Sequence, residues 1–217
     1  MKKLSIIVLC AMFAAFMVSC GGDKGAKGNP FGKIPSIVKN LMDEGEKLKK
    51  DAENMKSLGD MAKLISKGAK LASQFKEDVE KAAPSVVGNE LPTELAEGTT
   101  AITVVAPMAI EKVTPFNDFV TFTTKGKVAL AEDFDLNAEA NQGKKFINVK
   151  CTVLDKEGNP VEGYENKAVG NFDLAKLANE NNVVVKGTEI EIDKDLKFSD
   201  KSWEKLSELS KIVLTAE

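Results

Sequence analysis

The chain changes its hydrophobic periodicity near its middle, and this change limits the folds that it can adopt. Between residues 34 and 83, apolar side chains recur mostly at spacings of three and four, which predicts a helical segment. Pro35 suits a first helical turn, and Pro84 favours a helix end at the residue before it. Residues 84–100 are rich in proline and glycine and are predicted to be a linker.

Short runs of Val, Ile, Thr and Phe begin after this linker, and they are typical of strands. The expected strands cover residues 101–105, 119–124, 127–131, 146–154, 183–186, 188–192 and 211–215. Lys125-Gly126 stands where a two-residue hairpin loop would join two of them. Residues 172–180 and 202–209 are predicted to be short helices. Residues 101–217 are therefore expected to form an all-β two-sheet sandwich, which makes the whole chain α+β. Residues 144–160 resemble strand-turn pieces of bacterial immunoglobulin-like domains, a generic likeness that implies a fold class and no activity.

The helical segment is expected to be one long or broken amphipathic helix. A break near Gly59 would convert it into a helical hairpin, and the sequence leaves this alternative open. Residues 58–79 place an apolar stripe opposite the lysine side chains of Lys56, Lys63, Lys67 and Lys70. Such a face packs on its own domain, lies on an anionic membrane surface, or mediates self-association or contact with a protein partner. Packing on its own domain is the preferred interpretation.

The first residues have the arrangement of a secretory signal peptide. Lys2 and Lys3 precede an apolar run over residues 4–18, and a small residue, Ser19, follows it. The run is shorter than the approximately 20 apolar residues that a membrane-spanning helix needs. Residues 1–19 are therefore expected to be removed, and residues 20–33, rich in Gly and Lys, are expected to be a flexible tether.

Met17-Val18-Ser19-Cys20 resembles the lipobox of bacterial lipoproteins, with Met17 in place of the usual Leu. The resemblance implies cleavage before Cys20 and acylation of this residue, including palmitate, and two or three acyl chains anchor a protein stably to a membrane. Gly21 stands where an Asp tends to retain enterobacterial lipoproteins at the inner membrane, so the outer membrane is favoured. Lipoproteins of Bacteroidota often carry an acidic cluster after this cysteine for export, whereas here Asp23 is followed by Lys24. The choice between a periplasmic and a surface-exposed orientation therefore stays open.

Composition excludes several classes of function. The chain has no His and no Arg, so all 30 of its basic residues are Lys, against 33 acidic residues. Loss of residues 1–19 removes two lysines, which leaves 28 against 33 and a net charge of −5. A negative chain without the bidentate Arg fork is not expected to bind nucleic acid. The missing imidazole removes the commonest general base and metal ligand, so we expect no enzyme, no metal site and no cofactor.

Three cysteines are present, and the targeting segment accounts for two of them. Cys10 leaves with the signal peptide and Cys20 is the expected lipidation site. Cys151 alternates with Ile147, Val149 and Val153 along a predicted strand, so these four side chains share one face. Cys151 is therefore interpreted as a core thiol.

The remaining polar clusters and aromatic residues give weak functional signals. Glu132, Asp133 and Asp135 are interpreted as a solvated turn, and Trp203 as a packing residue on a helix face. Tyr164 is a weak candidate for a glycan-binding ring. The sequence thus favours a lipid-anchored, non-enzymatic binding or structural module of the cell envelope. A surface glycan-binding protein or a carboxylate-dependent hydrolase is the alternative.

Overall fold

The computed structural model describes residues 29–55, 57–116, 119–199 and 202–217. The predicted signal peptide and Cys20 lie outside the described residues. The chain divides into two compact units. The described residues of the first unit are those of 29–86, Val113–Phe122 and Lys197–Ser207, and those of the second are Val87–Lys112, Thr123–Leu196 and Glu208–Glu217.

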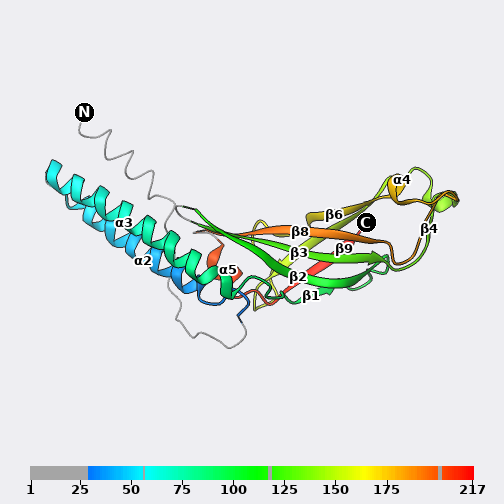
Figure 1. The fold of residues 1–217 in the computed structure, drawn as a ribbon, viewed down its shortest axis with the longest axis horizontal. Coiled ribbons are helices and arrows are strands. Elements are labelled where there is room, and N and C mark those ends of the chain that lie inside the picture. The colour runs from blue at the N-terminus through cyan, green and yellow to red at the C-terminus, as the bar shows by residue number, and fades with distance from the viewer. Residues whose placement is uncertain (1–28, 56, 117–118, 200–201) are drawn as a thin grey trace. The chain divides into compact units, whose positions relative to one another are not determined.

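The predicted helical segment is a hairpin of two helices, α2 (Ile34–Glu53) and α3 (Leu58–Ala82), which lie side by side (Figure 1). α2 ends at Glu53 and α3 begins at Leu58, so the helical segment is broken near Gly59, and the hairpin alternative is the one found. Ser57 is the N-cap of α3, and its Oγ accepts a hydrogen bond from the Asp60 backbone N–H at 3.1 Å. This side-chain cap satisfies one of the free N–H groups at the start of α3. The 3-10 helix η1 (Ala83–Ser85) follows α3.

An aromatic cluster forms part of the core of the first unit. Phe31 is fully buried, and its ring centroid lies 4.9 Å from that of Phe122 and 4.8 Å from that of Phe198, both in edge-to-face geometry. Such pairs stabilise a core beyond the area that they bury. Helix α5 (Trp203–Ser207) packs on α2 in the same unit. The last residues of the predicted tether, 29–33, are therefore part of the folded unit.

The strands form three sheets. One sheet has the order β1-β9-β5-β6, a second has the order β2-β3-β8, and β4 pairs with β7. The strands are β1 (Thr93–Leu95), β2 (Ile102–Pro115), β3 (Val120–Leu130), β4 (Phe134–Asp135), β5 (Phe146–Leu154), β6 (Lys167–Asp173), β7 (Val183–Val184), β8 (Glu189–Phe198) and β9 (Lys211–Ala216). β5 is antiparallel to both of its neighbours, whereas β1 runs parallel to β9. Helices and strands together make the chain α+β, as predicted.

The predicted hairpin loop at Lys125-Gly126 is wrong, because both residues lie inside the continuous strand β3. A Cβ atom on Gly126 would lie 3.0 Å from the Ala106 carbonyl oxygen and 3.2 Å from the Met108 Cα. The glycine therefore permits a close approach of two strands and does not form a turn.

Other differences lie at element boundaries. Phe172 belongs to β6, a strand that the sequence did not predict, and the helix expected over 172–180 shortens to α4 (Leu174–Leu177). β1 lies within the predicted linker 84–100. The strand predicted at 146–154 is confirmed residue for residue.

Two close approaches in the second unit bring the margins of the larger sheets together. A Cβ atom on Gly170 of β6 would lie 3.1 Å from the Glu191 carbonyl oxygen of β8. At the other margin, the Leu91 N–H donates to the Met108 carbonyl at 2.7 Å, two residues before β1 begins. The β1 side of one sheet thus lies near β2, and the β6 side lies near β8.

Candidate functional site

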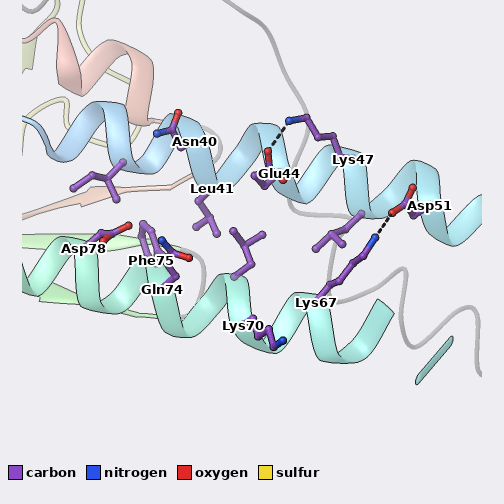
Figure 2. Close-up of a pocket in the computed structure, with 13 residues that line it drawn as sticks. Asn40, Leu41, Glu44, Lys47, Asp51, Lys67, Lys70, Gln74, Phe75 and Asp78 are labelled. Carbon is purple, nitrogen blue, oxygen red and sulfur yellow. Dashed lines mark hydrogen bonds and ion pairs between the residues drawn. The ribbon is translucent and has the colours of Figure 1, made fainter. Parts of the chain in front are cut away.

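A groove of about 740 Å³ runs between α2 and α3 in the first unit. Its floor is apolar and its rims are polar or charged (Figure 2). The lining residues are Ile37, Asn40, Leu41, Glu44, Lys47, Leu48, Asp51, Lys67, Lys70, Leu71, Gln74, Phe75 and Asp78.

The two helices supply the floor because their apolar residues recur at helical spacing. Leu41 and Leu48 on α2 and Phe75 on α3 are buried, and Leu41 and Phe75 point into the space between the helices (Figure 2). Ile37 and Leu71 line the same floor and are half-buried. An apolar floor between two helices is the geometry with which proteins bind a further amphipathic helix.

The charged side chains on the α2 rim form two ion pairs, one within α2 and one with α3. The Lys47 ammonium contacts the Glu44 carboxylate at 2.5 Å, and Lys67 from α3 reaches Asp51 at 3.1 Å (Figure 2). The Glu44 hydrogen bond raises the pKa of Lys47 above its ordinary value. All four side chains are more than half exposed, so water screens these pairs strongly and they orient the rim more than they stabilise it.

Part of the predicted apolar stripe on residues 58–79 remains exposed. Leu64, Phe75 and Val79 are buried, but Leu58 is 83 % exposed and Ile65 is 53 % exposed. Three of the lysine side chains opposite the stripe, Lys63, Lys67 and Lys70, are exposed as predicted, and Lys56 lies outside the described residues. The preferred interpretation, packing on the chain's own domain, therefore accounts for only part of this face.

Cys151 is a core residue, as predicted. Its side chain is 1 % exposed, and its three strand partners on the same face, Ile147, Val149 and Val153, are buried as well. Burial raises the pKa of the Cys151 thiol to about 11, and the positive charge of Lys194 opposes this rise. A protonated, enclosed thiol is a poor nucleophile, so Cys151 is not a candidate catalytic group.

The two aromatic residues singled out from the sequence lie outside the groove. Trp203 is 8 % exposed, which confirms it as a packing residue, and its indole N–H has no hydrogen-bond partner among the described residues. Tyr164 is half-buried in the loop after β5, where its carbonyl accepts from the Val153 N–H at 3.0 Å.

The acidic cluster around β4 uses its carboxylates to hold loops. Asp133 Oδ1 accepts from the Lys186 backbone N–H at 2.7 Å, and Asp135 Oδ1 accepts from the Asn137 N–H at 2.8 Å. Among the described residues, no group of three or more acidic or cysteine side chains is placed to hold a metal ion.

Comparisons with known proteins identified no relative of this chain. No protein-family model matches the sequence, and neither the curated proteins nor the solved structures gave a significant match. Within the described ranges, no helix has both the length and the apolar character that a membrane crossing requires. The hairpin groove is therefore the candidate functional site on its geometry alone.

Proposed function

We propose that this chain is a lipid-anchored protein of the cell envelope that acts as a non-enzymatic binding or structural module. The observation that carries the proposal is the groove between α2 and α3, which has an apolar floor and charged rims and is only partly enclosed. The site suits a protein surface better than a small substrate, because small-molecule sites enclose most of their ligand.

The second unit serves as a rigid β-sandwich in this proposal. Support comes from the contacts of Gly170 with β8 and of Leu91 with Met108, which bring both pairs of sheet margins close together. Alternating burial along β5 and β8 gives each strand one face for a core between the two sheets.

The anchor in this proposal is acylated Cys20, at the outer membrane. The lipobox residues Met17 to Cys20 and the Gly21 that follows support it. Thirteen sequence positions separate Cys20 from Ile34, where α2 begins, so the groove would be held close to the bilayer.

The anchor is tested in the full chain expressed with its leader in a bacterial host. Cys20→Ala is expected to abolish incorporation of radiolabelled palmitate and to release the chain from the membrane fraction. Cys151→Ala is the matched control and should keep both properties. Continued labelling of the Cys20→Ala chain would refute the anchor.

Binding is tested by isolating the anchored chain from its envelope after mild cross-linking. The proposal expects a stoichiometric protein partner, which includes a second copy of the chain. Recovery of no such protein, together with polysaccharide binding by the purified chain, would instead support the glycan-binding alternative.

A further inference from the structure

Two stacked aromatic rings lie where β2 ends and β3 begins, outside the aromatic core of the first unit. They are Phe116 and Phe119, with ring centroids 4.5 Å apart and an interplanar angle of 20°. The Phe116 N–H donates to the Phe119 carbonyl at 2.8 Å, so backbone pairing continues as far as this pair. Phe116 is 47 % exposed, whereas the core rings Phe31 and Phe122 are fully buried. The stacked pair, the Phe116–Phe119 tip, therefore presents apolar surface to its surroundings.

A lysine from β8 lies against the same tip. The Lys197 ammonium is 3.6 Å from the centroid of the Phe119 ring, which is a cation–π contact. Aromatic side chains are enriched at the depth of lipid headgroups, and lysine side chains are attracted to anionic lipids at the same depth. The tip therefore combines apolar area with positive charge, and these two terms determine binding at a membrane surface.

The described part of the chain begins close to this tip. Phe31 is held in the first unit by ring contacts with Phe122 and Phe198. Phe122 follows Phe119 by three residues, which is about 10 Å along an extended strand. Phe198 directly follows Lys197 in the sequence. Both rings that contact Phe31 thus lie on the strands that supply the tip.

The proposed anchor limits how far this region can lie from the bilayer. Nine sequence positions separate Cys20 from Asn29, whose side-chain amide donates to the Ser207 carbonyl of the first unit at 3.2 Å. An extended chain spans about 3.4 Å per residue, so Asn29 lies within about 30 Å of an acylated Cys20. Docking of the tip is then an intramolecular event, and a small apolar area is sufficient for it. It rests in this respect on the proposed lipid anchor.

We infer that the Phe116–Phe119 tip docks on the bilayer that holds the anchor, with Phe116 among the lipid headgroups and Lys197 beside their phosphate groups. An exposed ring alone would also suit a protein or a glycan. The short chain to Cys20 favours lipid, because it keeps the tip within reach of the bilayer surface. Attachment at one residue fixes only a distance, so the second contact at the tip gives the first unit a defined orientation on the membrane.

The other exposed, large apolar side chains described in the first unit suit this role less well. They are Leu58 and Ile65, both on α3. Leu58 lies past the far end of α2, whose 20 residues extend about 30 Å from the end next to Phe31. Ile65 stands between Ala62 and Ala69 on its face of the helix, and these small side chains add little apolar area.

Fluorescence quenching by lipid tests the docking. The mature chain, from residue 20, is coupled through its Cys20 thiol to a maleimide lipid in vesicles of phosphatidylethanolamine and phosphatidylglycerol, a part of them brominated. Cys151 does not compete for the maleimide, because burial raises its pKa to about 11. Phe116→Trp places an indole at the tip. Phe146→Trp is the matched control, since that ring is also 47 % exposed but lies on β5, and Leu58→Trp reports on the far end of the hairpin.

Brominated lipid should quench the indole that Phe116→Trp introduces. Phe146→Trp and Leu58→Trp should show no more quenching than the unaltered chain, in which Trp203 is buried. Circular dichroism verifies that each variant is folded. Pro115→Trp, at the neighbouring half-buried position, replaces Phe116→Trp if that variant does not fold.

Removal of the positive charge supplies an independent measurement. In the Phe116→Trp background, Lys197→Gln should lower the ratio of docked to undocked chain about fivefold, which is the contribution of one lysine near an anionic surface. Lys63→Gln is the matched control, because this lysine is exposed on α3 in the same unit, and it should leave the ratio unchanged.

Several results would overturn the inference. They are equal quenching of Phe116→Trp and Phe146→Trp, stronger quenching of Leu58→Trp than of Phe116→Trp, and an unchanged ratio in Lys197→Gln. A blue shift of Phe116→Trp that brominated lipid does not quench, and that grows with the density of coupled chain, would identify a second copy as the occupant instead. Chemical coupling separates the two proposals, because it supplies the attachment without the cell. Quenching without palmitate labelling in cells contradicts the anchor alone, and labelling without quenching contradicts the docking alone.

Discussion

Removal of the Phe31 ring should destabilise the first unit strongly. The side chain is fully buried and contacts two other rings, those of Phe122 and Phe198. Truncation of a buried Phe to Ala usually costs about 3–5 kcal/mol, because the lost transfer free energy adds to that of the cavity left behind. Phe31→Ala should fall in this range. The loss is large beside the approximately 5–15 kcal/mol that stabilises a typical domain.

The free energy of unfolding can be measured locally, because Trp203 is the single tryptophan and lies in the same unit. Urea unfolding of the chain from residue 20 with Cys20→Ala, followed by Trp203 fluorescence, should show a midpoint about 2 M lower for Phe31→Ala. Phe146→Ala is the matched control, since that ring is 47 % exposed on β5 of the second unit. Should Phe31→Ala fail to fold, Phe31→Leu gives a smaller and still measurable loss. A change below about 1 kcal/mol in Phe31→Ala would refute the burial of Phe31 and the boundary drawn for the first unit.

Three further predictions concern local features. Ser57→Ala removes the cap of α3 and should cost about 1 kcal/mol, visible as faster hydrogen exchange in the first turn of α3 while exchange in α2 away from the turn is unchanged. Gly126→Ala should lower the thermal midpoint, because the added methyl group clashes with the neighbouring strand at a cost of about 1–3 kcal/mol. Gly59→Ala is the control: its methyl group has room in a helix and should stabilise the chain by up to about 1 kcal/mol, which raises the midpoint. The opposite order of midpoints would contradict the strand packing. Cys151 should resist alkylation in the folded chain at pH 8. Because its folded pKa is raised to about 11 from an ordinary 9.0, its contribution to stability is complete below pH 9 and is lost as the pH rises towards 11. A stability that is equally pH-dependent in Cys151→Ala would contradict this origin.

Local chemistry made some parts of the fold predictable. The strand at 146–154 alternates cleanly because one face meets a core, and this pattern also identified Cys151 as buried. The sequence left the choice between one helix and a helical hairpin open, because a glycine such as Gly59 weakens a helix without necessarily ending it. Ser57 decides the position, since a side-chain cap lowers the free energy of a helix start where a glycine alone gives none.

Contacts between distant residues explain most of what the sequence did not reveal. A glycine at position 126 is compatible with a hairpin turn and with a tightly packed pair of strands. Only the close approach of the Ala106 carbonyl, which the local sequence does not reveal, identifies the second case. Phe31 was assigned to a flexible tether because its neighbours are Gly and Lys. Its partners, Phe122 and Phe198, belong to strands far along the chain, so no local window contains the reason for its burial.

The candidate site was also only partly predictable from the sequence, because a helical wheel does not show how much of an apolar face is covered. The helical wheel of residues 58–79 predicted one wide apolar stripe, and a two-helix hairpin can cover only a narrow seam of it. Leu64, Phe75 and Val79 occupy that seam, while Leu71 remains half-buried in the groove and Ile65 is 53 % exposed. A stripe wider than the hairpin can bury is expected where a further helix completes the packing, as in bundles of four helices.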